Sequence, residues 1–132
     1  MGELITLIVR GMCCLIAGMK GYSENIEVLS IVDKYLEHAR VHIYCNGGNE
    51  LIYLTSADFM TRNIDTRVEV GFPIYDEQLK KEVRDIIDLQ LEDNTKSREI
   101  NSHNTNKYHK TKSDLPQRAQ VDIYNYLKYK AQ

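Results

Sequence analysis

The chain has 132 residues, the size of one ordinary domain, and 42% of them are hydrophobic, which is enough apolar material to bury a core. Its 17 Lys and Arg residues face 19 Asp and Glu residues, and the net charge of -2 gives no general attraction to nucleic acid or to acidic membranes. Because the overall charge attracts no anion, an anion site must come from locally placed cations. No apolar stretch approaches the ~20 residues of a membrane-spanning helix.

Five short runs rich in β-branched residues predict strands in the first three fifths of the chain. Some are nearly continuously apolar, as in buried strands, and others alternate with period 2, as in half-buried strands. The runs are Leu4–Val9, Ile26–Val32, Val41–Cys45, Leu51–Thr55 and Val68–Ile74. Asn46–Asn49 (NGGN) is a strong turn signal between the third and fourth runs. Gly71 and Pro73 weaken the last run as a strand.

The remaining chain predicts helices and one long loop. Apolar residues at helical spacing indicate a helix within Asp76–Asp93, and Asp76 and Glu77 favour its start by their charge. Residues 94–115 are polar and predict a long loop, and Pro116 can open a final helix. The pattern therefore predicts an α/β (α+β) fold, a single domain over residues 1–132 whose mixed β-sheet is flanked by helices.

His38 and Arg40 form an H-x-R pair just before the third predicted strand. If that strand begins early, period 2 places both side chains on one face. Imidazole can attack or polarise a phosphoryl group, and a guanidinium can bind its oxygens in a bidentate manner. The spacing alone favours a surface or packing histidine, with a catalytic His38 as the alternative.

Three further places carry candidate phosphate ligands. Arg10, followed by Gly11, ends a predicted strand where ligands bind in open α/β sheets, and a salt bridge that caps the sheet is an equal alternative. Ser56 offers a hydroxyl after the fourth strand, where a plain turn is the more frequent explanation. Arg62 and Arg67 form either a phosphate-facing pair or part of a local set of ion pairs.

A group of cations surrounds Tyr108 and His109 late in the chain. Its members are Lys107, Lys110, Lys112 and Arg118. A solvated loop explains such a group most often, but a flexible basic loop also suits a polyanion. No phosphate-binding glycine loop, metal-ligand cluster or nucleic-acid motif is present in the sequence. Cys13, Cys14 and Cys45 lack C-x-x-C spacing and favour free thiols in the cytoplasm.

Long strings of the chain resemble the C-terminal part of the bacterial polyphosphate kinase family, in the same order. The strings are LIVRGMC (7–13), SENIEVLSIVDKYLEHARV (23–41), NGG (46–48), TSADFMTRNIDTRVEV (55–70), LKKEVRDIIDLQLEDN (79–94), NKY (106–108) and RAQVDIYNYL (118–127). The resemblance covers almost the whole chain and implies a phospholipase D-like fold, the last domain of a larger ATP–polyphosphate phosphotransferase.

The resemblance implies reversible transfer of the ATP γ-phosphate to inorganic polyphosphate, with Mg²⁺ and a phosphohistidine intermediate. It places the phosphorylated histidine and the Mg²⁺ ligands upstream of this chain, so no metal ligands are expected here and the isolated chain is expected to be inactive. Arg10 and His38 match ATP-binding positions, and His38 matches a second active-site histidine. Arg40, Ser56, Arg62 and Arg67 are candidate phosphate-facing residues. The upstream domains of the same enzyme are expected partners.

Two alternative functions remain beside the kinase. One is a phospholipase D-like phosphodiesterase, although Arg40 stands where those enzymes carry the lysine of an H-x-K pair. The other is a non-catalytic module that binds nucleotide or polyphosphate. As part of the full-length kinase, the chain is expected to be cytoplasmic and homo-oligomeric. Neither a nucleic-acid partner nor a membrane-spanning segment is expected, and association with a membrane surface stays open.

Overall fold

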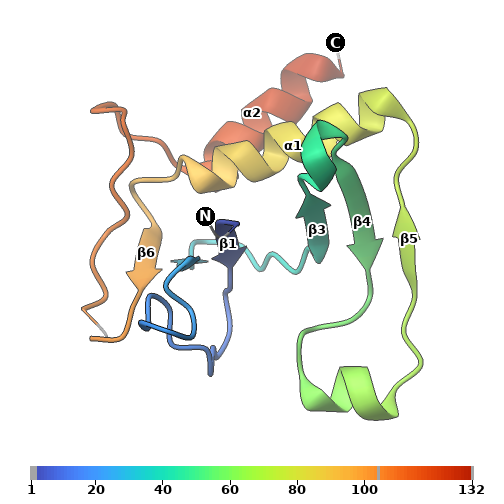
Figure 1. The fold of residues 1–132 in the computed structure, drawn as a ribbon. Coiled ribbons are helices and arrows are strands. Elements are labelled where there is room, and N and C mark those ends of the chain that lie inside the picture. The colour runs from blue at the N-terminus through green and yellow to red at the C-terminus, as the bar shows by residue number, and fades with distance from the viewer. Residues whose placement is uncertain (1–2, 104, 132) are drawn as a thin grey trace. The chain divides into compact units, whose positions relative to one another are not determined.

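The computed structural model describes residues 3–103 and 105–131, and the chain divides into two compact units. Unit 1 combines Met1–Tyr35 with Ile86–Gln132, and unit 2 is Leu36–Asp85. The fold class is α+β, as predicted, but the strands form two three-stranded sheets, one in each unit (Figure 1). That the two units together make one domain stays a prediction.

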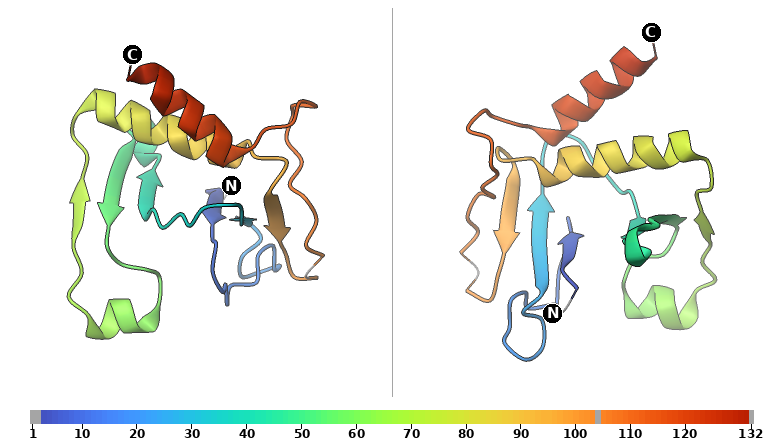
Figure 2. Two further views of the ribbon diagram at one scale, coloured as in Figure 1. Left: turned by 180° about the vertical axis from the view of Figure 1, so that it is seen from behind. Right: turned by 45° about the horizontal axis from the view of Figure 1, so that its top comes forward.

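The sheet of unit 1 is mixed and has the order β1-β2-β6. β1 (Ile5–Ile8) runs parallel to β2 (Ile26–Ile31), and β6 (Ser97–Ile100) pairs with β2 in the antiparallel direction. The right view of Figure 2 shows the three strands side by side. The core of this unit gathers on β2, where Val28 and Leu29 are 2% and 4% exposed. Central position in the sheet explains the apolar composition of β2.

β6 corrects the prediction that residues 94–115 form a long loop. Its sequence, Ser-Arg-Glu-Ile, has no apolar alternation and therefore carries no strand signal. The strand exists because β2 offers it four partner residues, and because the returning chain adds two backbone bonds. The amide of Glu99 donates to Lys107 O at 2.9 Å, and the amide of His109 donates to Ser97 O at 2.9 Å.

The sheet of unit 2 is antiparallel and has the order β3-β4-β5. β3 (Val41–Tyr44) and β4 (Leu51–Thr55) are joined by a short 3₁₀ turn, η1 (Asn46–Gly48), in which Asn46 and Gly47 have φ of 45° and 64°. Asn and Gly tolerate this left-handed backbone, which explains the turn signal. β5 (Gly71–Pro73) begins three residues later and ends one residue earlier than the predicted run, although the amide of Ile74 still donates to Ile52 O at 2.9 Å.

A long connection links β4 to β5 and carries a single π-helical turn, η2 (Arg62–Thr66), at its far end (Figure 1). The amides of Asn63 and Ile64 both donate to Met60 O, at 2.9 and 3.1 Å. Asn63 is the buried residue of this turn, with 3% of its surface exposed. The turn therefore holds two candidate arginines, Arg62 and the following Arg67, on an ordered connection.

Two helices complete the fold. α1 (Glu77–Leu91) is capped by Asp76, whose Oδ1 accepts the amides of Gln78 and Leu79 at 2.9 Å each. α2 (Ala119–Lys130) begins three residues after Pro116, later than the sequence suggests. Neither described helix is long and apolar enough to cross a membrane.

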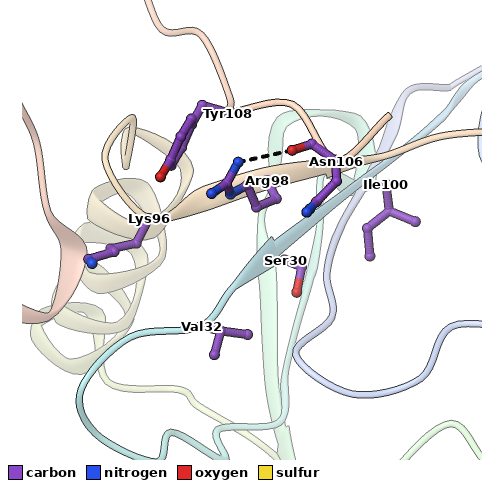
Figure 3. A pocket seen from close by; sticks show the side chains of 7 residues that line it. All are labelled: Ser30, Val32, Lys96, Arg98, Ile100, Asn106 and Tyr108. Atoms are coloured by element: carbon purple, nitrogen blue, oxygen red, sulfur yellow. Dashed lines mark hydrogen bonds between the residues drawn. The ribbon is translucent and has the colours of Figure 1, made fainter. Parts of the chain in front are cut away.

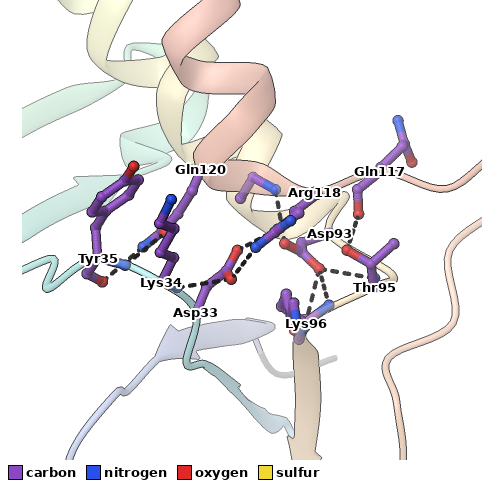
Figure 4. A network of polar contacts seen from close by, with 11 residues as sticks. Asp33, Lys34, Tyr35, Asp93, Thr95, Lys96, Gln117, Arg118 and Gln120 are labelled. Atoms are coloured by element: carbon purple, nitrogen blue, oxygen red, sulfur yellow. Dashed lines mark hydrogen bonds and ion pairs between the residues drawn. The ribbon is translucent and has the colours of Figure 1, made fainter.

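A polar network in unit 1 joins the end of β2 to the start of α2 (Figure 4). Arg118 donates from Nε and Nη2 to the two carboxylate oxygens of Asp33, at 2.7 and 2.6 Å, and only 2% of the Asp33 side chain is exposed. This bidentate guanidinium lowers the pKa of the Asp33 carboxyl. Arg118, a member of the predicted basic cluster, is thus committed to a buried carboxylate.

Asp93 lies beside this pair and is 0% exposed. Its Oδ1 accepts the amides of Thr95, Lys96 and Ser97 at 2.6 to 3.0 Å, and its Oδ2 accepts the amide of Ala119 at 2.8 Å. Four backbone donors therefore surround one buried carboxylate. Asp93 ties the turn before β6 to the first residue of α2.

Candidate functional site

His38, Arg40 and Asp58 form a compact polar cluster in unit 2. Arg40 and Asp58 flank the paired strands β3 and β4, since the amide of Thr55, at the end of β4, donates to Arg40 O just before β3. Arg40 Nε donates to Asp58 Oδ1 at 2.6 Å, and its Nη2 lies 2.9 Å from His38 Nε2. His38 Nε2 also lies 3.3 Å from Asp58 Oδ1. His38 and Arg40 therefore contact each other directly, although β3 begins only at Val41, after both residues.

The contacts of the imidazole nitrogen cannot all be hydrogen bonds at once. Arginine only donates, so the 2.9 Å contact with Arg40 requires an Nε2 of His38 without a proton. In that tautomer the proton lies on Nδ1, for which the described residues give no partner. When Nε2 carries a proton, the same atom can instead donate to Asp58. The cluster can thus accommodate either form of the ring.

The cluster is partly open to solvent. The exposed fractions of the side chains are 54% for His38, 26% for Arg40 and 28% for Asp58. The hydrogen bond from Arg40 lowers the pKa of the Asp58 carboxyl, with a smaller effect from His38, and Asp58 raises the pKa of Arg40. Asp58 is therefore an anion under ordinary conditions. It holds a cation beside an accessible imidazole.

A second cluster occupies the connection between β4 and β5. The Ser56 hydroxyl donates to Glu69 Oε2 and accepts the amide of Val70 at 3.0 Å, while Asn63 Nδ2 donates to Glu69 Oε1 at 2.7 Å. These two donors lower the pKa of the Glu69 carboxyl. The buried Oδ1 of Asn63 has no partner among the described residues. In this arrangement the Ser56 hydroxyl donates its proton to Glu69 and so links the two ends of the β4–β5 connection.

Arg62 and Arg67 are exposed, and neither makes an ion pair within 3–103 or 105–131. The positive charge of Arg67 contributes to the lowered pKa of Glu69. The two guanidinium groups therefore differ from that of Arg40, which is hydrogen-bonded to both of its neighbours. Of the predicted phosphate-facing residues, Arg62 and Arg67 keep their donors available.

Arg10 lies in unit 1, directly after β1, where the amide of Val9 donates to Leu29 O at 2.8 Å. Its side chain is exposed and forms no ion pair in the described part of the chain, so the sheet-capping salt bridge is not observed. A Cβ atom built on Gly11 would meet no atom within 4 Å, so this chain does not itself require glycine there for space.

Asp58 and Glu69 are the members of the two clusters that the sequence analysis did not single out. A carboxylate 18 residues from Arg40 has no spacing signal, because the contact depends on the pairing of β3 with β4. Among the described residues, no group of three or more His, Cys, Asp and Glu side chains is placed to hold a metal ion.

Comparison with known proteins gives the family. Residues 1–120 match the family model described as polyphosphate kinase C-terminal domain 2. The polyphosphate kinases of Escherichia coli (strain K12) and Salmonella typhimurium (strain LT2) are 50% and 49% identical over 127 residues, which is 96% of this chain and 18% of each relative.

A solved structure is similar over the same extent. The crystal structure of polyphosphate kinase from Porphyromonas gingivalis matches with a TM-score of 0.90 and 46% identity, covering 96% of this chain and 19% of that chain. The chain thus spans less than a fifth of the length of these relatives. The agreement of sequence and fold leads to one conclusion: the chain belongs to the polyphosphate kinase C-terminal domain 2 family.

Proposed function

We propose that this chain supplies the nucleotide-facing part of a polyphosphate kinase active site. In that enzyme the ATP γ-phosphate would be transferred reversibly to inorganic polyphosphate through a phosphohistidine that lies outside this chain. The observation that carries the proposal is the exposed His38, held by Arg40 and Asp58, in a chain of this family. The relatives named as polyphosphate kinases support the reaction class.

Arg40 gives His38 a defined chemical role. By donating to Nε2, Arg40 favours the tautomer that carries its proton on Nδ1, and Nδ1–H can then donate to a phosphate oxygen. If the ring gains a second proton, Asp58 can accept a hydrogen bond from Nε2 and balance the charge. His38 can therefore donate a hydrogen bond or a proton to a phosphate group, while Arg40 serves as a positioning residue.

Arg10 contributes a guanidinium without an ion-pair partner among the described residues, at the end of β1. Such a group can bind two phosphate oxygens and offset the charge that develops on them during phosphoryl transfer. Arg62 and Arg67 are further candidates for phosphate contacts because their donors are available. We assign Ser56 to the support of the β4–β5 connection in the arrangement observed, since Glu69 and Val70 occupy its hydroxyl.

ATP and polyphosphate are the substrates of this proposal, and Mg²⁺ is the expected metal. The described residues offer no cluster that fits Mg²⁺, and Asp58 is already bound by Arg40. Following the family resemblance, we propose that the magnesium ligands lie in other parts of the enzyme, and we assign no step of this chain to the metal. The upstream domains would be partners, and the full-length kinase would be a cytoplasmic homo-oligomer.

Substitutions in the full-length enzyme test the proposal. His38→Ala and Arg10→Ala should each lower ATP-dependent polyphosphate synthesis by about 10²-fold or more, because each removes a donor to the transferring phosphates. His103→Ala is the matched control, since His103 is exposed and, within the described residues, its recorded hydrogen bond runs from its backbone amide to Asn101 Oδ1. Near wild-type synthesis by either site variant, with the control equally active, would exclude that residue from the site.

A further inference from the structure

A cavity of about 430 Å³ opens on the sheet of unit 1, and none of the residues assigned above lines it (Figure 3). Side chains of β2 and β6 and of the returning segment form its walls. The lining residues are Ser30, Val32, Lys96, Arg98, Ile100, Asn106 and Tyr108. Two cations and one aromatic ring thus share a single opening.

The register of the sheet explains why these residues face one cavity. Ser30 pairs with Arg98, and Val28 pairs with Ile100, in the antiparallel ladder. Because side chains alternate along a strand, Ser30 and Arg98 share a face with Ile100, opposite the face that carries the buried Ser97. Arg98 therefore stands on the same face as Ser30, and both side chains line the cavity.

Arg98 is held in a fixed orientation before any ligand arrives. Its guanidinium carbon lies 3.4 Å from the centroid of the Tyr108 ring, and its Nη1 donates to Asn106 O at 3.0 Å (Figure 3). Asn106 has a φ of 49°, a left-handed backbone that asparagine tolerates. Stacking on the ring leaves the in-plane donors Nε and Nη2 without a contact in the described residues. These donors are therefore available to an anion.

Neither cation of the cavity is neutralised by an ion pair in residues 3–103 and 105–131. Lys96 acts on Asp33 only through its charge, and Asp33 is already held by Arg118. Glu99 follows Arg98 in the sequence, but its side chain points to the other face of the sheet. Its Oε1 lies 3.7 Å from His109 Nδ1. Within the described part of the chain, the cavity therefore has an excess of positive charge and no counterion.

We propose that this cavity binds two or more phosphate groups of a linear inorganic phosphate chain. Arg98 would hold one group with its free edge donors, and Lys96 would hold the next, with the Ser30 hydroxyl as a further donor. The volume exceeds that of one phosphate and lies within the range of ordinary ligand pockets. The assignment of the anion as polyphosphate rests on the proposed function, whereas the excess charge does not.

The position of the cavity fits a path for a phosphate chain. β1 and β2 are parallel, so their carboxyl ends lie at the same edge of the sheet. Val32 follows β2 at that edge and Lys96 precedes β6 there, while Arg10 follows β1. A polyanion held by Lys96 and Arg98 would thus extend along the edge of the sheet where Arg10 lies. In the described residues, the guanidinium of Arg10 has no ion-pair partner.

Titration of the isotopically labelled chain with tripolyphosphate tests the inference. In the wild-type chain, the amide chemical shifts of Lys96, Arg98 and Tyr108 should change together and give the same dissociation constant. Arg98→Gln and Lys96→Gln should each weaken that affinity by about tenfold, because each removes one charged donor. Lys128→Gln is the matched control, since it removes the same charge from the exposed end of α2. Thermal unfolding confirms that each variant is folded, and Lys96→Gln leaves the Arg98–Tyr108 stack untouched.

Four outcomes overturn the inference. The first three are no shift at these amides, equal weakening by Lys128→Gln, and a response to sulfate as strong as the response to tripolyphosphate. ATP serves as the competing source of phosphate groups, and tighter binding of ATP than of tripolyphosphate would assign the cavity to a nucleotide instead. Polyphosphate synthesis by the wild-type full-length enzyme is a separate measurement. If that enzyme is active but the wild-type cavity does not bind tripolyphosphate, this inference alone fails. If the cavity binds but the enzyme has no kinase activity, the proposed function alone fails.

Discussion

The two units each contain an aspartate bound by an arginine, and the surroundings give the two pairs different roles. In unit 1, Asp33 is buried and both of its oxygens are bound by Arg118. In unit 2, Asp58 is 28% exposed, and the arginine that binds it also contacts an exposed imidazole. The ion pair of unit 1 therefore satisfies a buried carboxylate and supports the fold. In our proposal, the open ion pair of unit 2 holds the imidazole of His38 in position.

The largest expected effect on stability comes from the scaffold of unit 1. Asp93→Ala removes the acceptor of four backbone amides in a fully buried position. Each unsatisfied buried donor costs about 1–3 kcal/mol, so we expect the free energy of unfolding to fall by about 3 kcal/mol or more. Urea denaturation measures it, and Ser102→Ala, at an exposed loop position, is the control. A loss below about 1 kcal/mol would contradict the scaffold role.

The open pair of unit 2 should affect turnover and leave the fold intact. Asp58→Asn removes the anion that holds Arg40, so the imidazole loses its fixed partner. We expect kcat of the full-length kinase to fall by about tenfold, with KM for ATP nearly unchanged. Asp58→Glu, which keeps the anion, should restore part of the lost kcat. A loss of kcat that Asp58→Glu does not restore at all would contradict the role of this anion in holding Arg40.

Acid should separate the two aspartates by their contribution to stability. Both carboxyls have a lowered pKa in the folded chain, so each stabilises the fold above the pKa of an unfolded aspartate, about 3.9, and loses this contribution as the pH falls through the folded pKa. Because Asp33 is the more buried, Asp33→Asn should flatten the acid side of the stability profile more than Asp58→Asn. Denaturation midpoints between about pH 6 and pH 3 would show it, and the reverse order would contradict the comparison.

The smallest effects are expected for the exposed arginines of the β4–β5 connection. Arg62→Ala and Arg67→Ala should leave the unfolding midpoint nearly unchanged, since neither side chain forms an ion pair within the described residues. If either binds phosphate, polyphosphate synthesis should fall by a few-fold to about tenfold. Initial rates at saturating and limiting ATP measure it. Unchanged rates in both variants would remove these two residues from the proposed site.

Local patterns predicted most of the secondary structure correctly. The apolar runs around β1 to β4 and the helical spacing of α1 carry their own periodicity, because each buries a face that must be apolar. β6 was missed because its residues are polar and its pairing with β2 supplies the order. Local sequence patterns also could not predict that the strands form two sheets, because strand pairing depends on residues far apart in the chain.

For the site, the sequence by itself determined the family through long collinear strings, and it selected His38 and Arg10 as the residues to follow. Only the tertiary structure decided what surrounds them. It placed Asp58 against Arg40, used the Ser56 hydroxyl for Glu69, and left Arg98 stacked on Tyr108 with free donors. Periodicity records which faces are buried, whereas the partner of a charged side chain is set by strand register and chain return, which no local spacing encodes.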